Sequence, residues 1–160
     1  MFRDLLANWT KTTLRKRTAT PRWDLGFYPQ PLSCRNILLV EQRDEVFDRV
    51  ATDLTAAGLQ ITRARHAAAA IKKCVHFSPD LLVANFDLPD SSGWLLTAKA
   101  RLMFPTPNVW LYAPWPSPQE TAMAQFVGAD GLFAYRGDVR RLSAVIISRL
   151  AVLPALRLGA

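Results

Sequence analysis

The sequence contains few of the residues from which metal centres and disulfide frameworks are built. Its 160 residues include two cysteines, Cys34 and Cys74, and two histidines, His66 and His76. The cysteines show neither a CxxC motif nor histidine-rich ligand spacing, so we expect no metal site and a reduced protein. Cys74 and His76 lie two residues apart on a predicted helix, face different sides and therefore cannot pair as nucleophile and base.

Several sequence motifs of enzymes are also absent. The chain has no GxGxxG, no P-loop and no GxSxG motif, so dinucleotide binding, nucleotide hydrolysis and serine-hydrolase chemistry have no support. Ser91 and Ser92 precede Gly93 and are better explained as a helix N-cap than as nucleophiles. We therefore expect no enzymatic activity, no catalytic residue and no cofactor.

No hydrophobic run is long enough to cross a bilayer. The most apolar tract, residues 144–158, is interrupted by Arg149, Pro154 and Arg157, which leaves too few residues between charges for a membrane helix. We recognise no signal peptide either. These two observations predict a cytoplasmic protein without a membrane anchor.

The positive charge of the chain is concentrated in an N-terminal arm, residues 1–35. The formal net charge is +7, and the arm holds seven Lys and Arg against two Asp and Glu. Apolar residues at helical spacing predict a short amphipathic helix over residues 2–17: Phe2, Leu5, Leu6 and Trp9. A basic group adjoins it: Lys11, Arg15, Lys16 and Arg17. Prolines make residues 18–33 an extended linker. The arm could pack on its own domain, dock to another protein, or bind nucleic acid or an anionic membrane.

From residue 36 onward, strand and helix patterns alternate. Strands are predicted over residues 36–41, 59–63, 81–85, 108–113 and 131–135. Helices are predicted over residues 44–57, 66–77, 93–104, 117–127 and 138–153. This alternation predicts an α/β fold of the flavodoxin-like type, a doubly wound five-stranded parallel sheet in the order 2-1-3-4-5 with helices on both faces. We expect one domain over residues 36–153 and a tail over 154–160.

The segment that organises the domain is residues 79–94, PDLLVANFDLPDSSGW. Its apolar run ends at Asn85 and is followed by turn-forming residues, as a buried parallel strand ends. Ligands of open α/β sheets bind at the carboxyl ends of strands. A site is therefore expected at Asn85 and the loop that follows it.

Four segments together resemble the receiver domain of bacterial two-component response regulators. They are ILLVEQ, PDLLVANFDLPDSSGW, NVWLYAP and VGADGLFAY, in that order over residues 35–150. The resemblance implies a phosphorylation site made of an acidic pair, a phosphoacceptor Asp, a Thr or Ser, and a Lys followed by Pro. These roles fall on Glu41 and Gln42, Asn85, Ala113 (or Tyr112 after a shift of one residue), Tyr135 and Arg136.

The residues at these positions predict a degenerate site and hence a pseudo-receiver. An amide oxygen is a poor nucleophile and forms no stable acyl phosphate, and Mg²⁺ prefers carboxylates to amides. Asp87 is an alternative acceptor but a disfavoured one, because the resemblance gives its position a backbone-carbonyl role and its side chain should point into the loop. Having lost charges of both signs, the pocket is expected to be near-neutral and hydrogen-bonded, and filled by Tyr135 and Arg136 rather than open to a small ligand.

Two surfaces are candidates for binding a protein partner. Trp115 lies in the loop APWPSP, where three prolines hold it outside the core. The last helix carries an apolar stripe that we expect to be covered by the arm or by a partner: Val139, Leu142, Val145, Ile146, Ile147, Leu150 and Val152. The resemblance implies docking or homodimerisation through the fourth helix, fifth strand and fifth helix. We expect an adaptor without an output domain; the alternative is a protein that binds nucleic acid or anionic membrane through its arm.

Overall fold

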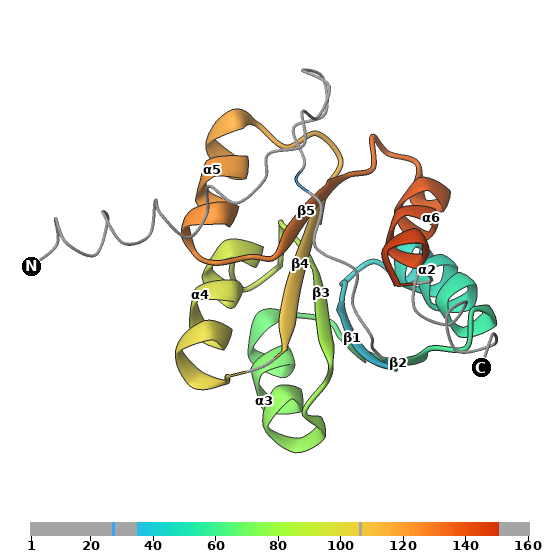
Figure 1. Cartoon of the computed structure of the whole chain (residues 1–160), viewed down its shortest axis with the longest axis horizontal. Coiled ribbons are helices and arrows are strands. Elements are labelled where there is room, and N and C mark those ends of the chain that lie inside the picture. The colour runs from blue at the N-terminus through green and yellow to red at the C-terminus, as the bar shows by residue number, and fades with distance from the viewer. Residues whose placement is uncertain (1–26, 28–34, 106, 151–160) are drawn as a thin grey trace, which may run out of the picture.

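A computed structural model of the chain describes residues 27, 35–105 and 107–150. The five strands form one parallel sheet in the order β2-β1-β3-β4-β5, as predicted (Figure 1). The strands are β1 (Asn36–Val40), β2 (Gln60–Ala64), β3 (Leu81–Asn85), β4 (Asn108–Ala113) and β5 (Gly131–Ala134). The helices are α2 (Asp44–Ala56), α3 (Ala67–Phe77), α4 (Gly93–Met103), α5 (Pro118–Phe126) and α6 (Val139–Leu150).

Several predictions lie outside the described residues. They concern the amphipathic helix with Phe2, Leu5, Leu6 and Trp9, the basic group with Lys11, Arg15, Lys16 and Arg17, and the tail beyond residue 150. The structure therefore tests the sheet and its helices, and it leaves the roles of the arm as predictions.

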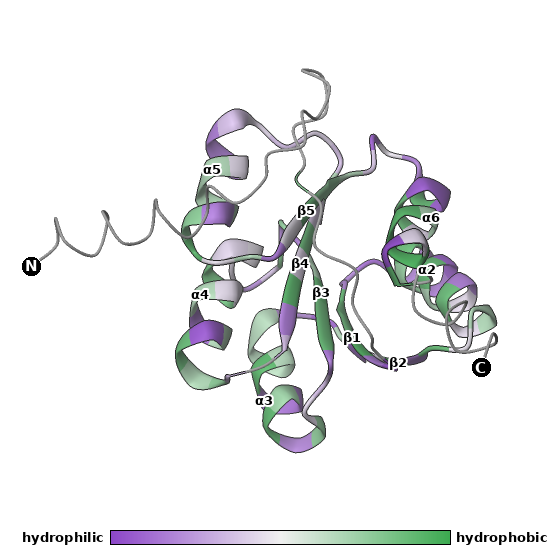
Figure 2. Ribbon diagram, in the orientation of Figure 1, coloured by the Kyte–Doolittle hydropathy of each residue, from purple (hydrophilic) through white to green (hydrophobic). Residues whose placement is uncertain are grey.

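Two apolar clusters hold the helices against the two faces of the sheet (Figure 2). One lies between the sheet and α3, α4 and α5, and the other between the sheet and α2 and α6. Every residue of β3 is buried, because a central parallel strand is covered on both faces and is therefore apolar throughout. This explains why β3 and β4 have the boundaries that their apolar runs predict.

Helix ends follow the capping chemistry of the sequence. The Ser92 side chain accepts a hydrogen bond from the backbone N–H of Leu95 and begins α4. Ser117 and Glu120 form a capping box at the start of α5. Gly58, with φ at +87°, ends α2 in the left-handed conformation that glycine adopts without a side-chain clash. The predicted N-cap before Gly93 is thus confirmed at Ser92.

Helix α3 is covered along one stripe of its surface. Val75 is 57% exposed, whereas Ala70 and Cys74 are buried. Residues 70 and 74 are one helical turn apart, and residue 75 lies about 100° further around the axis. The alanines let α3 approach the sheet closely, so only a narrow stripe of the helix is covered.

The apolar stripe of α6 belongs to the domain's own core. Leu142 and Ile146 are fully buried, and Val139 is partly buried against the same cluster. Helices α6 and α2 pack side by side on one face of the sheet (Figure 1). The prediction that these three residues form a partner-binding surface is therefore wrong for Leu142 and Ile146, whose contacts are already made by α2 and the strands.

Candidate functional site at the carboxyl ends of the strands

The centre of the site is Glu41, the residue directly after β1. Its side chain is completely buried, although Glu is among the residues least often buried without a partner. Its Oε2 accepts hydrogen bonds from Asn85 Nδ2 at 3.0 Å and from the Tyr112 hydroxyl at 2.7 Å. Carboxylate, amide and phenol thus meet where β1, β3 and β4 end.

Arg43 supplies the positive charge that balances the buried carboxylate. Its Nε lies 3.0 Å from Glu41 Oε1, and its Nη2 lies 3.0 Å from Glu41 Oε2. The backbone N–H of Arg43 also donates to Oε1, at 2.8 Å. This is the two-pronged geometry in which a guanidinium binds a carboxylate most strongly. The pocket therefore contains a compact ion pair. It is near-neutral and hydrogen-bonded, but the expectation that charges of both signs are lost is wrong, because Glu41 and Arg43 supply one of each.

The buried ion pair sets the direction of three pKa shifts. Burial by itself raises the pKa of Glu41, but the hydrogen bonds from Arg43 and Tyr112 outweigh it and hold that pKa below its ordinary value. The carboxylate raises the pKa of the Arg43 guanidinium. Burial, followed by the nearby negative charge, raises the pKa of Tyr112 well above its usual range. At neutral pH the group is an anion, a cation and a neutral phenol.

Asn85 uses both ends of its amide inside the protein. Its Nδ2 donates to Glu41, and its Oδ1 accepts a hydrogen bond from the backbone N–H of Asp87 at 3.0 Å. An aspartate here could not make the first bond, because a carboxylate at neutral pH has no proton to donate. The amide at this position is thus matched to its neighbours, and the side chain is 5% exposed.

Tyr112, not Ala113, provides the polar side chain at the end of β4. Tyr112 pairs with Asn85 in the sheet and points its hydroxyl at Glu41. Ala113 is buried in the cluster on the opposite face of the sheet, as expected of adjacent residues on a strand. No side-chain hydroxyl or amine stands at the Ala113 position.

Tyr135 closes the site from β5, and Arg136 lies outside it. The Tyr135 hydroxyl accepts a hydrogen bond of 3.3 Å from Arg43 Nη2, and its ring packs edge-on against Tyr112 with centroids 5.9 Å apart. Arg136 is partly exposed, and its guanidinium lies 5.9 Å from the ring centroid of Trp115. Tyr135 therefore fills the pocket as predicted, whereas Arg136 does not.

The loop between β1 and α2 is held by two further arginines from β2 and the residue after it. Arg63 donates to the backbone carbonyls of Glu41 and Gln42, each at 3.1 Å, and Arg65 donates to that of Gln42 at 3.3 Å. Both guanidinium groups also contact Asp44. The Gln42 side chain is exposed. The segment around the carboxylate is thus surrounded by three guanidinium groups.

These residues do not fit the Mg²⁺ ion that the receiver resemblance implies. Mg²⁺ needs carboxylate oxygens with free lone pairs and several waters. Both Glu41 oxygens are bound by Arg43, and the adjacent Gln42 and Asn85 side chains are neutral amides. Within residues 35–105 and 107–150, no three His, Cys, Asp or Glu side chains group as ligands. We derive no step through this ion.

The loop after β3 supports the site by close backbone packing. A Cβ added to Gly93 would lie 2.7 Å from the Asn85 carbonyl oxygen and 3.0 Å from the Phe86 Cα, so only glycine fits at the start of α4. Asp90 accepts hydrogen bonds from the backbone N–H groups of Ala67 and Ala68 at 2.8 and 3.0 Å. The loop thereby fastens the N-terminus of α3, while the Asp87 side chain stays exposed.

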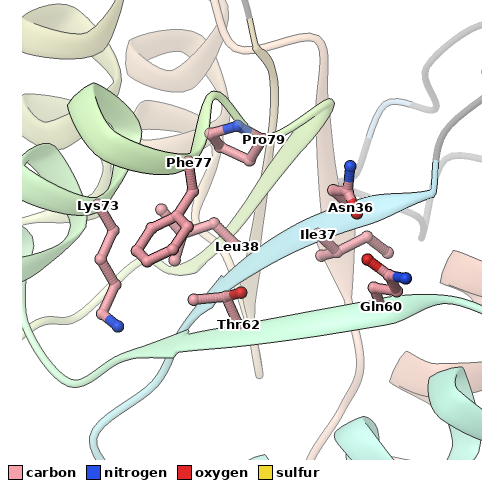
Figure 3. A pocket seen from close by; sticks show the side chains of 8 residues that line it. All are labelled: Asn36, Ile37, Leu38, Gln60, Thr62, Lys73, Phe77 and Pro79. Atoms are coloured by element: carbon pink, nitrogen blue, oxygen red, sulfur yellow. The ribbon is translucent and has the colours of Figure 1, made fainter.

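A separate cavity opens at the opposite, amino end of the sheet (Figure 3). Its volume is about 270 Å³, and side chains of α3, β1 and β2 line it, with Pro79 at its rim. Figure 3 shows Phe77 and Lys73 on one side and Leu38 and Thr62 on the other. Asn85 and Tyr135 do not line this cavity. The cavity is therefore not the small-ligand pocket that the sequence analysis weighs beside those two residues.

Two site residues differ from the prediction. The sequence predicts no role for Arg43, and it indicates Tyr112 only as the alternative to Ala113. The resemblance places the Thr or Ser role at Ala113, and a shift of one residue places it at Tyr112. Arg43 lies in a loop, and no periodicity marks its role. The spacing of Glu41 and Arg43 could have indicated this role, because an arginine two residues after a glutamate at a strand end can fold back onto that carboxylate.

Comparisons with known proteins agree with this architecture. No protein-family model matches the sequence, and no curated protein matches it either. Among solved structures, the chemotaxis response regulator CheY4 of Vibrio cholerae superposes with a TM-score of 0.66 at 18% identity, covering 74% of this chain and 100% of that one. A CheY-like receiver domain protein of Methanospirillum hungatei gives 0.65 at 23% identity, covering 74% and 95%. A putative response regulator of Chloroflexus aurantiacus gives 0.64 at 21%, covering 74% and 99%.

The chain therefore has the fold of response-regulator receiver domains. At these identities the likeness establishes the fold alone. The geometry around Glu41 must be interpreted on its own chemistry. None of the described helices is long and apolar enough to cross a membrane.

Proposed function

We propose that this protein is a degenerate receiver that accepts no phosphoryl group and acts as a protein-interaction module in a bacterial, cytoplasmic signalling assembly. The observation that carries the proposal is the ion pair between Glu41 and Arg43, completed by Asn85 and Tyr112. This group of side chains occupies the place where a receiver would hold a metal ion and a phosphoryl group.

The chemistry of the site opposes phosphotransfer at each step. Asn85 is a neutral amide engaged in two hydrogen bonds, so it is a weak nucleophile. Glu41 is bound to a guanidinium and cannot recruit a divalent cation. Without a divalent cation, charge developing on a transferring phosphoryl group would lack the metal that ordinarily neutralises it. The neutral amide of Asn85 and the engaged carboxylate of Glu41 also support our proposal that the protein is not an enzyme.

The outer helical surface supports a role in binding proteins. We use this name for the exposed apolar side chains of α3, α4 and α5: Val75, Phe77, Leu95, Leu102, Met103, Met123 and Phe126. Helices α3 and α4 carry three lysines and Arg101 and no Asp or Glu, although Arg101 is paired with Asp130; α5 carries Glu120 and no Lys or Arg. A surface both apolar and basic is complementary to a partner with apolar and acidic side chains. The 69% exposed Trp115 adds an aromatic contact on another part of the domain.

Phosphoryl uptake tests the proposal directly. The purified chain is incubated with acetyl phosphate and Mg²⁺ and its intact mass is measured, beside a response regulator with a complete acidic site. We expect no adduct on this chain and a stoichiometric adduct on the reference protein. An adduct of one phosphoryl group on the wild-type chain would overturn the proposal.

The Asn85→Asp variant separates a missing nucleophile from a closed site. If only the nucleophile were lacking, restoring the carboxylate would restore uptake. We expect no uptake, because Arg43 still binds both Glu41 oxygens and residue 42 is still an amide, so the acidic pair that would hold Mg²⁺ is not restored. Uptake by this variant would show that the ion pair does not close the site.

A further inference from the structure

The outer edge of β5 is bound by a residue from before the domain. Strand β5 ends the sheet and has β4 as its only neighbour among the strands. Leu132 donates its backbone N–H to the Phe27 carbonyl at 3.0 Å, and Phe27 donates to the Leu132 carbonyl at 3.1 Å. Figure 1 shows residue 27, in blue, beside β5. Both outward-facing backbone groups of Leu132 are therefore satisfied by an antiparallel bridge.

The Phe27 side chain anchors this bridge. It is partly buried and packs against the apolar cluster that contains Leu132 and the covered residues of α4 and α5. Paired backbone hydrogen bonds together with one aromatic anchor are the means by which an extended peptide adds to a free sheet edge. The edge of β5 therefore has the chemistry of a strand-addition site.

The sequence limits the length of this bridge. In an antiparallel pair centred on residues 27 and 132, the next paired positions are 29 with 130 and 25 with 134. Residue 29 is proline, which has no N–H to donate to the sheet. Asp130 lies before β5, and its N–H already donates to the Val109 carbonyl at 2.7 Å, so this position adds no bond to the bridge.

The tether between Phe27 and the sheet favours binding within the same chain. Seven residues, 28–34, separate Phe27 from Arg35, and they can span at most roughly 28 Å. Phe27 lies one strand beyond β5, so it is four strand spacings, about 19 Å, from β1 across the sheet. Such a short tether gives an effective concentration on the order of millimolar. A weak external peptide therefore cannot compete unless the Phe27 segment is released.

We propose that the edge of β5 is a strand-addition site for an extended peptide with an aromatic anchor, and that its occupant is the chain's own segment at Phe27. The site uses backbone groups of β5 and the cluster behind it, so it is independent of the chemistry at Glu41. The proposal can fail while the phosphoryl-uptake experiment succeeds, and the reverse also holds.

Amide hydrogen exchange at Leu132 tests whether the edge is covered. In the full-length wild-type chain we expect this amide to be protected. Phe27→Pro removes the N–H donor and the ring, and we expect Leu132 to exchange at least tenfold faster while the amides of β3 are unchanged. Phe27→Ala keeps the backbone donor and should give an intermediate rate, which also covers the case in which the proline variant folds poorly. Equal Leu132 exchange in all three proteins would overturn the proposal.

A peptide with the sequence of residues 20–33 tests the docking site itself. We expect the labelled peptide to bind full-length Phe27→Pro at least tenfold more tightly than the wild-type chain, because the wild-type site is already filled. The same peptide carrying Phe27→Pro is the matched control and should not bind. Equal affinity for both proteins, or binding to neither, would refute the site.

Discussion

At the carboxyl edge of the sheet a charged side chain is buried, whereas on the outer helical surface large apolar side chains are exposed. At the edge, the Glu41 carboxylate is fully buried and receives hydrogen bonds from Arg43, Asn85 and Tyr112. On the outer surface, Leu102 is 87% exposed and Phe77 is 62% exposed. Burying a charge costs free energy unless the charge is paired. A large apolar group that stays exposed does not gain the free energy of leaving water.

The difference indicates where the protein can still interact. A buried polar group whose bonds are all made inside the protein has none left for a ligand, and changing its state requires breaking several of them. Exposed apolar side chains gain free energy when a partner covers them. In this domain the hydrogen bonds of the site are made among its own residues, and we propose that partners bind at the exposed apolar side chains outside it.

Arg43→Ala should give the largest effect of the changes that test this comparison. It removes the guanidinium and leaves Glu41 buried with a charge that only Asn85, Tyr112 and one backbone N–H stabilise. Breaking a fully buried ion pair costs roughly 3–5 kcal/mol, and because the Arg43 side chain is 41% exposed, so that water can enter, we expect about 2–3 kcal/mol.

Urea unfolding at pH 7 measures this loss, with Arg49→Ala as the matched control. Arg49 pairs with Asp53 one helical turn away on the surface of α2, and surface pairs of this kind contribute about 0.3–0.5 kcal/mol. Similar losses for the two variants would mean that the ion pair at the site is no more important than a surface pair.

Acid should remove the contribution of Glu41, the next largest effect. Because its pKa in the folded protein is lower than the ordinary value of 4.5, its stabilising contribution is present above pH 4.5 and is lost as the pH falls through the folded pKa. Glu41→Gln lacks this titration. We expect the variant to be about 1–2 kcal/mol less stable than wild type at pH 7.

The measurement is the difference in unfolding free energy between wild type and Glu41→Gln as a function of pH. Subtracting the two curves removes the contribution of other carboxylates whose pKa is also lowered, such as Asp44 and Asp90. The difference should shrink below pH 4.5. A difference that stays constant down to pH 3 would contradict the assigned pKa direction.

Much of the fold and part of the site follow from local sequence. Strands β3 and β4 were predicted with their observed boundaries, because an apolar run that ends in turn residues fixes both the strand and its carboxyl end. The same argument placed Asn85 in the site. These predictions depend only on residues that are adjacent in the chain.

The remaining errors concern side chains whose environment depends on tertiary packing. Arg43 is in a loop, and its partner is chosen by the reach of a flexible side chain rather than by any repeat. Leu142 and Ile146 were assigned to a partner because the stripe of α6 is wide, but α2 packs beside α6 and covers them. Periodicity indicates which residues avoid water and not which neighbour shields them.

Leu102→Ala should have the smallest effect, and Leu96→Ala in the same helix is its matched control. Leu102 is 87% exposed and Leu96 is completely buried. Removing the buried side chain leaves a cavity and should cost about 2–5 kcal/mol, whereas the exposed change should stay within about 0.5 kcal/mol. Thermal or urea unfolding of both variants measures the contrast. A loss above about 1 kcal/mol for Leu102→Ala would show that this side chain stabilises the fold, and its exposure would then no longer indicate a surface available to partners.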